Sequence, residues 1–337
     1  MALWLIRAGR HGEREQLALD QGVVAIGWDE LSDLSSIESR EELLALIKET
    51  YPGDKQGTQY SWTGQLWRFL TEIKVGDRVA MPLKSKAAVA FGTIKGDYRY
   101  VASNPPSSRH TRKVEWTHEI LRSKIPQDLL YSLGALLTVC KLSRNDAENR
   151  FEALLTGKAV QSAQPVLNDS DDGAGEAIDF EQYARDQITE YIQQNFKGHG
   201  LARLTGAVLG AEGYDVTVSP EGPDGGVDIL AGTGPMGFGT PRLCVQVKSG
   251  QDPVDVKVLR ELQGVMSNFG AQQGLLVSWG GFKRTVVSEA RQRHFEIRLW
   301  DSDELVRRIQ ANYRKLPDEI QAELPLKPIW VLVPEEE

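Results

Sequence analysis

The chain has 337 residues, 41% hydrophobic and 26% charged, which is typical of a globular protein long enough for two domains. No stretch approaches the roughly 20 apolar residues of a membrane span, and the N-terminal apolar run is too short for a signal peptide. We therefore expect a cytoplasmic protein with no membrane partner. Cys140 and Cys244 lie in apolar runs, which excludes a disulfide framework or a cysteine-rich zinc site and predicts buried thiols.

The net charge of -8 is unevenly distributed along the chain. Residues 1–158 hold 22 Lys and Arg against 20 Asp and Glu, so the net negative charge of the chain comes from residues 159–337. Residues 84–124 carry nine basic side chains against three acidic ones, which predicts a local basic face, although such a run is more often only a solvated surface. The candidates for contacts with a DNA backbone are Lys84, Lys86, Arg109, Arg112 and Lys113.

Residues 1–158 predict a first domain built on a small curled sheet or barrel that carries two or three helices. The alternating or apolar runs that predict strands are residues 2–9, 22–28, 76–83, 87–100 and 112–120. Apolar residues at helical spacing predict helices over residues 40–51 and 63–73.

Residues 159–180 are small, polar and acidic, without hydrophobic periodicity, and predict a linker. Residues 181–337 predict a second α/β domain with a mixed sheet between helices, followed by a C-terminal extension. Its expected helices cover residues 180–196, 200–213, 254–269, 283–293 and 301–315. Its expected strands cover residues 214–220, 226–230, 242–249, 272–279 and 295–300.

Two of these strands carry a combination that suits phosphodiester hydrolysis. Asp228 opens the strand GVDIL, and Gln246 and Lys248 lie two apart on the strand CVQVK, so they share one face. A nuclease needs carboxylates to hold a divalent cation and a cation or lysine to stabilise charge on the phosphate. A lysine within an otherwise apolar strand is unusual, because burial of its charge is costly unless the charge is paired.

The blocks GYDVTVSPEGPDGGVDIL, LCVQVKS, VLRELQGVM, QGLLVSWGGF and FEIRLWDSDELV resemble the catalytic domain of Mrr-type restriction endonucleases, a branch of the PD-(D/E)xK nucleases. The resemblance covers about residues 185–310. It implies that Asp228 binds metal, that Gln246 takes the polar motif position, and that Lys248 is the catalytic lysine. It also implies a metal-ligating carbonyl at Val247 and Mg²⁺, or Mn²⁺, as the cofactor of an endodeoxyribonuclease.

The first helix of that family carries a Phe-Glu pair, and here the corresponding positions are Leu201 and Ala202. Glu190 and His199 are the nearby residues that can replace the missing acid. Without a replacement, metal binding rests on Asp228, carbonyls and water, and catalysis is weak or depends on assembly with DNA. The alternative is a nucleic-acid-binding sensor or adaptor whose nuclease fold is weakened or inactive.

Each motif also has a structural interpretation. Asp-Gly-Gly alone predicts a turn, which is the role expected for Asp224, and Gln-x-Lys alone is a common edge-strand feature. Arg260 and Glu261 are candidates to orient Lys248 or the scissile phosphate, or to form an ordinary surface pair within one helix.

The first domain is rich in aromatic residues near its strands and its basic segment. This pattern is similar to the PUA-like group that includes EVE and YTH domains, over residues 1 to about 140. The similarity implies an aromatic cage that binds a flipped modified base, with Trp28, Trp62, Trp116 and Tyr98 as its candidates. Tryptophan in a small domain is more often part of the core, so both interpretations stay open.

Together these features predict a modification-dependent, type IV-like DNA restriction endonuclease. The first domain reads a modified base in double-stranded DNA, and the second cuts nearby with Mg²⁺. Because one such active site cuts one strand, a double-strand break requires two sites and predicts a homodimer.

Overall fold

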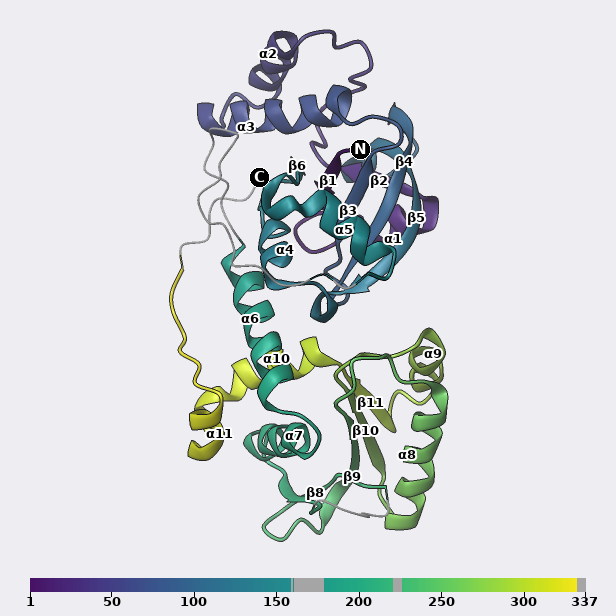
Figure 1. Ribbon diagram of the computed structural model, residues 1–337, viewed down its shortest axis with the longest axis vertical. Coiled ribbons are helices and arrows are strands. Elements are labelled where there is room, and N and C mark those ends of the chain that lie inside the picture. Colours follow the sequence, from purple (N-terminus) through teal and green to yellow (C-terminus); the bar gives the residue numbers. More distant parts are fainter. Residues whose placement is uncertain (159, 161–178, 221–225, 332–337) are drawn as a thin grey trace. The chain divides into compact units, whose positions relative to one another are not determined.

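The computed structural model describes residues 1–158, 160, 179–220 and 226–331 (Figure 1). The chain divides into two compact units, one formed mainly by Met1–Tyr183 and the other by Ala184–Trp330. Most of the expected linker, residues 159–180, lies outside the described residues. Among the helices that are described, none is long and apolar enough to cross a membrane.

The first unit contains a six-stranded sheet in the order β2-β5-β4-β3-β1-β6. Its strands are β1 (Leu3–Ile6), β2 (Val23–Ile26), β3 (Arg78–Pro82), β4 (Ala88–Tyr100), β5 (His110–Leu121) and β6 (Val139–Lys141). β1 and β3 run parallel, and all other neighbours are antiparallel. Because β2 and β6 are its outer strands, the sheet in the described residues is open, and the expected closure into a barrel is wrong.

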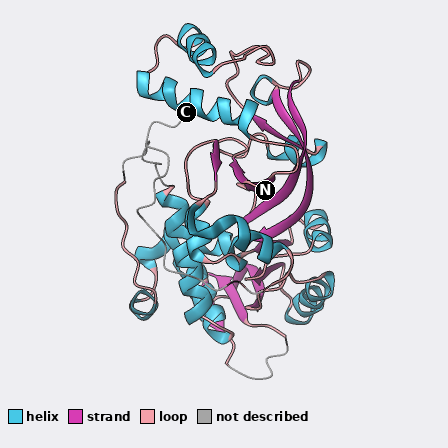
Figure 2. Ribbon diagram, turned by 45° about the horizontal axis from the view of Figure 1, so that its top comes forward, coloured by secondary structure: helices cyan, strands magenta, loops and turns pink. Residues whose placement is uncertain are grey.

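The two longest strands of this unit, β4 and β5, curve strongly along their length (Figure 2). The pairing register shifts between Phe91 and Gly92 and again between Ile94 and Tyr98, and such bulges bend and twist a strand pair. The helices of the unit are α1 (Glu15–Gln21), α2 (Arg40–Thr50), α3 (Gln56–Trp67), α4 (Gln127–Ser132) and α5 (Ala147–Leu155). Side chains of α2 and α3 join one apolar cluster of the sheet, and side chains of α4 and α5 join another.

The second unit contains a five-stranded mixed sheet in the order β11-β10-β9-β8-β7. Its strands are β7 (Asp215–Val218), β8 (Ile229–Thr233), β9 (Gly239–Lys248), β10 (Gln273–Ser278) and β11 (Ile297–Trp300). β9, β10 and β11 run parallel, whereas β7, β8 and β9 are antiparallel. The expected α/β class and mixed sheet are therefore confirmed.

Helices cover both faces of this sheet (Figure 1). Its helices are α6 (Phe180–Asn195), α7 (His199–Ala211), α8 (Val256–Phe269), α9 (Arg284–Gln292), α10 (Ser302–Asn312) and α11 (Asp318–Glu323). Val245 and Val247 pack with α6, α7 and α10, while Cys244 and Leu276 pack with α8 and α9. Successive residues of β9 thus face opposite helical layers, as the alternation of a strand requires.

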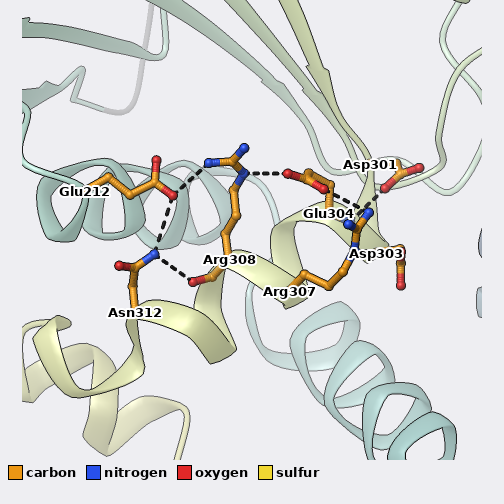
Figure 3. A network of polar contacts seen from close by, with 7 residues as sticks. All are labelled: Glu212, Asp301, Asp303, Glu304, Arg307, Arg308 and Asn312. Carbon is orange, nitrogen blue, oxygen red and sulfur yellow. Dashed lines mark hydrogen bonds and ion pairs between the residues drawn. The ribbon is translucent and has the colours of Figure 1, made fainter.

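A polar network joins the C-terminal turn of α7 to α10 (Figure 3). The Arg308 guanidinium donates to Glu304 at 2.7 Å and to Glu212 at 2.8 Å, and it lies 4.2 Å from the centre of the Trp300 ring. Burial opposes its charge, but hydrogen bonds to these two carboxylates raise the pKa of Arg308. Asp301 caps α10 by accepting from the Glu304 N–H at 2.9 Å. The network thus fixes the helical layer that covers one face of the sheet.

Candidate active site of the second unit

Asp228 lies immediately before β8 and contacts two residues of the neighbouring strand β9. Its backbone N–H donates to the Val245 carbonyl at 3.0 Å, and its carboxylate accepts from the Val247 N–H at 2.7 Å. Where β8 begins, a side-chain oxygen therefore replaces a main-chain acceptor of the sheet. The two bonds of Asp228 are to the residues on either side of Gln246, so Asp228 lies opposite Gln246. The structure thus brings these two predicted residues together.

Gln246 occupies a polar position inside an otherwise apolar strand. Only 5% of its surface is exposed, and its buried Oε1 atom has no hydrogen-bond partner among the residues that the structure describes. A buried amide oxygen without a partner costs about 1–3 kcal/mol, so its presence calls for an explanation. Lys248, two residues further along β9, is half-buried and makes no ion pair within the described residues.

The donor atoms near Asp228 fit a hard divalent cation that keeps most of its water. Mg²⁺ is commonly held by one or two carboxylates together with waters and phosphate oxygens, and amide oxygens are acceptable ligands. Asp228 supplies a carboxylate, and Gln246 supplies an Oε1 oxygen that accepts no hydrogen bond from the described part of the chain. No group of three His, Cys, Asp or Glu side chains suited to a metal occurs in the described part of the chain.

The position of the missing helix acid is filled by a core residue. Ala202 on α7 is 2% exposed and packs in the apolar cluster with Leu201 and Leu204. Glu190 lies within α6, where its carboxylate accepts from Gln194 at 3.1 Å. His199 is the first residue of α7.

Two further predictions concern residues around these strands. Asp224, expected in the turn, lies outside the described residues. Arg260 pairs with Glu289 of α9 at 3.1 Å, and this partner raises the pKa of the Arg260 guanidinium. Glu261 lies 3.9 Å from Lys257, one turn away on α8. Both residues thus have partners on the helical layer, and none of these contacts involves Lys248.

In the first unit, two of the four aromatic candidates lie together. The rings of Trp28 and Trp62 are 6.4 Å apart and nearly perpendicular, and Tyr51, which the sequence did not single out, lies 5.0 Å from Trp62. Trp28 has a φ of 66°, a left-handed conformation that is unusual for a bulky residue. Trp62 is 8% exposed, and its buried Nε1 has no hydrogen-bond partner in the described part of the chain.

Tyr98 supports the segment that follows Trp28. Its hydroxyl accepts from the Leu34 N–H at 3.1 Å and lies 2.8 Å from Nδ1 of the buried His110. Burial raises the pKa of Tyr98 to about 12 and lowers the pKa of His110. The Trp116 Nε1 donates to the Ala18 carbonyl of α1 at 2.9 Å. All four candidates pack in or against one apolar cluster, and Trp28 and Trp62 are in direct ring contact.

The structure corrects the expectation for Arg112. This side chain is 2% exposed, and its guanidinium donates to the carbonyls of Phe69, Leu70 and Gly96. The first two belong to a single π-helical turn, Arg68–Glu72, whose carbonyls need donors from outside the turn. Arg112 thus has a structural role and presents no surface to a phosphate.

The other four basic candidates lie at least partly at the surface. Lys84 is 3.5 Å from Asp179, and Lys86 is 2.6 Å from Glu119, so both have acidic partners. Arg109 is half-buried and donates weakly to the Asn104 carbonyl at 3.4 Å. Lys113 is exposed and has no ion pair within the described residues.

The second unit is thus an α/β domain with a mixed sheet, with an aspartate before β8 and Gln-x-Lys at the end of β9. Residues 193–309 match the family model Mrr_cat, described as "Restriction endonuclease". The resemblance to Mrr-type catalytic domains is thereby confirmed, and this part of the chain is a restriction endonuclease domain. Residues 4–142 match a different family, described as "Domain of unknown function (DUF8426)", which does not test the resemblance to PUA-like domains.

Two solved structures show a distant likeness. One is "DNA modification-dependent restriction endonuclease AspBHI", with 13% identity, a TM-score of 0.34, and coverage of 81% of this chain and 74% of that one. The other is "MspJI Restriction Endonuclease in Complex with 27-mer Oligonucleotide", with 15% identity, a TM-score of 0.32, and coverage of 96% and 80%. No curated protein matches the chain.

Proposed function

We propose that this protein is a modification-dependent DNA endonuclease in which the second unit hydrolyses a phosphodiester and the first unit selects the DNA. The observation that carries the nuclease part is Asp228, whose main chain and carboxylate bracket the unpartnered Gln246 on β9. Asp228 and Gln246 would hold Mg²⁺ or Mn²⁺, with the Val247 carbonyl as a further ligand. The cation supplies Lewis-acid stabilisation of the phosphate.

Each residue of this site has a separate task. Asp228 provides the negative charge that retains the cation, and its bond to the Val247 N–H fixes the direction of the carboxylate. Gln246 offers a neutral oxygen, which adds a ligand without adding charge. The Lys248 ammonium neutralises charge that develops on the phosphate oxygens during attack by water.

The test compares Asp228→Asn and Lys248→Ala with the surface control Lys257→Ala on phage and methylated DNA with Mg²⁺. Asparagine retains an oxygen that accepts from Val247 and loses the charge, so the fold is kept while metal binding is lost. We expect at least a hundredfold slower cleavage for both site variants and an unchanged rate for the control. Unchanged cleavage by either site variant contradicts the assignment.

The reader function rests on Trp28 and Trp62 together with Tyr51. A base stacked on aromatic rings gains about 1–3 kcal/mol, so loss of one ring should weaken binding by about fivefold or more. By the similarity to PUA-like domains, Trp28→Ala and Trp62→Ala should reduce binding of modified duplexes and leave plain duplexes unaffected. Equal loss on both duplexes favours an adaptor role for the first unit instead.

A second candidate function is a DNA-binding sensor with an inactive nuclease fold. The buried Ala202 in place of the helix acid favours it. Calorimetric titration with Mg²⁺ and Mn²⁺ separates the two functions, because the sensor has no metal site to titrate. Sedimentation of the chain with and without modified DNA tests the proposed homodimer.

A further inference from the structure

The three residues assigned to the nuclease site do not include a clear proton acceptor. Attack on a phosphodiester by water requires a group that takes the proton of the water. A lysine ammonium has only donors, and a neutral amide is not a base. The Asp228 carboxylate already accepts from the Val247 N–H and is the cation ligand. The helix position at which the family carries its glutamate is the buried Ala202.

His199 lies at the end of the catalytic strand. The N–H of its neighbour Gly198 donates to the Ser249 Oγ at 3.1 Å, and Ser249 directly follows Lys248. Gly198 has a φ of 54°, a left-handed conformation that lets the chain turn sharply from α6 into α7. This bond fixes the start of α7 beside the last residues of β9.

His199 also shares a helix face with the missing acid. Positions 199 and 202 are three residues apart on α7, and residues at this spacing are neighbours on a helix surface. The imidazole at position 199, next to the residue that contacts Ser249, can thus serve the edge of the sheet that an acid at 202 serves in the family. His199 is half-buried, and no hydrogen bond or ion pair engages its ring within the described residues.

Glu190, the other residue considered as a replacement, is less well placed. Its carboxylate accepts from Gln194 on its own helix at 3.1 Å. It is two residues from Ile192, which is fully buried in the core, and two residues correspond to about 200° around a helix. Glu190 is therefore on the side of α6 opposite the core contact of Ile192.

We propose that His199 is the proton acceptor of the nuclease site, an inference that rests on the proposed endonuclease function. An O–H bond of the attacking water breaks, and its proton passes to a ring nitrogen of His199. The water oxygen bonds to phosphorus, and the bond from phosphorus to the leaving deoxyribose oxygen breaks. That oxygen takes a proton from solvent, so the products are a phosphate monoester end and a hydroxyl end.

The experiment measures single-turnover cleavage of modified DNA by His199→Ala and His199→Gln, with Glu190→Gln as the matched control. Removal of a general base should slow cleavage by about 10²–10⁴-fold. The control should cut at the wild-type rate. Added imidazole should restore cleavage to His199→Ala and should not restore it to Asp228→Asn, a response that a structural role does not produce.

Thermal unfolding and binding of the uncut duplex in EDTA should be unchanged in His199→Gln, which shows that folding and DNA binding are intact. Cleavage by His199→Ala at the wild-type rate, or a loss that imidazole leaves unchanged, overturns the role of His199 alone. A wild-type chain that cuts none of the modified DNAs overturns the endonuclease function and this inference together.

Discussion

Replacement of Gln246 by leucine should stabilise the second unit while it abolishes cleavage. The side chain is 5% exposed, makes no hydrogen bond within the described residues, and buries Oε1 without a partner. Its neighbours toward α8 and α9 include Cys244 and Leu276, which are fully buried, so leucine enters an apolar environment of similar volume. Relief of one unsatisfied buried acceptor is worth about 1–3 kcal/mol.

A gain of this size should be visible in thermal unfolding without metal. For a unit of this length, each kcal/mol raises Tm by roughly 2–4 °C. Calorimetry of the whole chain should follow the transition, because tryptophan fluorescence also reports the tryptophans of the first unit. With Mg²⁺, wild type should gain stability by mass action and Gln246→Leu should not. If Gln246→Leu melts at a lower temperature than wild type in EDTA, the oxygen has a partner and the reasoning fails.

Three further predictions concern the first unit. Arg112→Met should destabilise it by about 3 kcal/mol or more, measured by urea unfolding, because one buried and two partly buried carbonyls lose their donor; an unchanged midpoint would show that water replaces the guanidinium. Burial lowers the pKa of His110, so the unfolded chain binds the extra proton and stability falls as the pH drops below about 6.5. Unfolding at pH 5.5 and 7.5 should show this slope in wild type, and a slope that persists in His110→Gln excludes His110 as its source. Trp62→Phe keeps an aromatic ring but removes Nε1, which has no hydrogen-bond partner within the described residues. If Nε1 contacts the modified base, calorimetry should show about tenfold weaker binding of modified duplexes. Equal affinity of the wild type and Trp62→Phe contradicts a role for this atom.

The second unit could be predicted well from sequence because each of its elements has a strong local signal. The apolar run 272–279 and the periodic segment 254–269 correspond to β10 and α8, and order and spacing set Asp228 against β9. The bond from the Val247 N–H to the Asp228 carboxylate was not predictable. This bond depends on where β8 begins, and the ends of a strand are set by its pairing with the neighbouring strand rather than by residue type.

The first unit shows where such signals fail. Arg112 belongs to a basic run and suggested a surface, but the π-helical turn at Arg68–Glu72 leaves carbonyls that only a long buried donor can reach. No local sequence pattern predicts this hydrogen bond, because it joins residues more than 40 positions apart. Tyr51 was missed for a similar reason, since its packing on Trp62 joins the C-terminal cap of α2 to α3. The short β6, with three residues, carries too little pattern to predict.

Asp228 connects the architecture of the second unit with its chemistry. Its carboxylate satisfies the Val247 N–H, which β8 does not reach, and the same contact holds it beside the one amide oxygen of the strand that lacks a partner. A single side chain thereby completes the sheet and, in the proposed nuclease, would also orient a cation ligand. The proposed site accordingly depends on the backbone of β9 for its geometry. The groups proposed to act on phosphate and water are Lys248, at the end of that strand, and His199, on the helix fixed beside it.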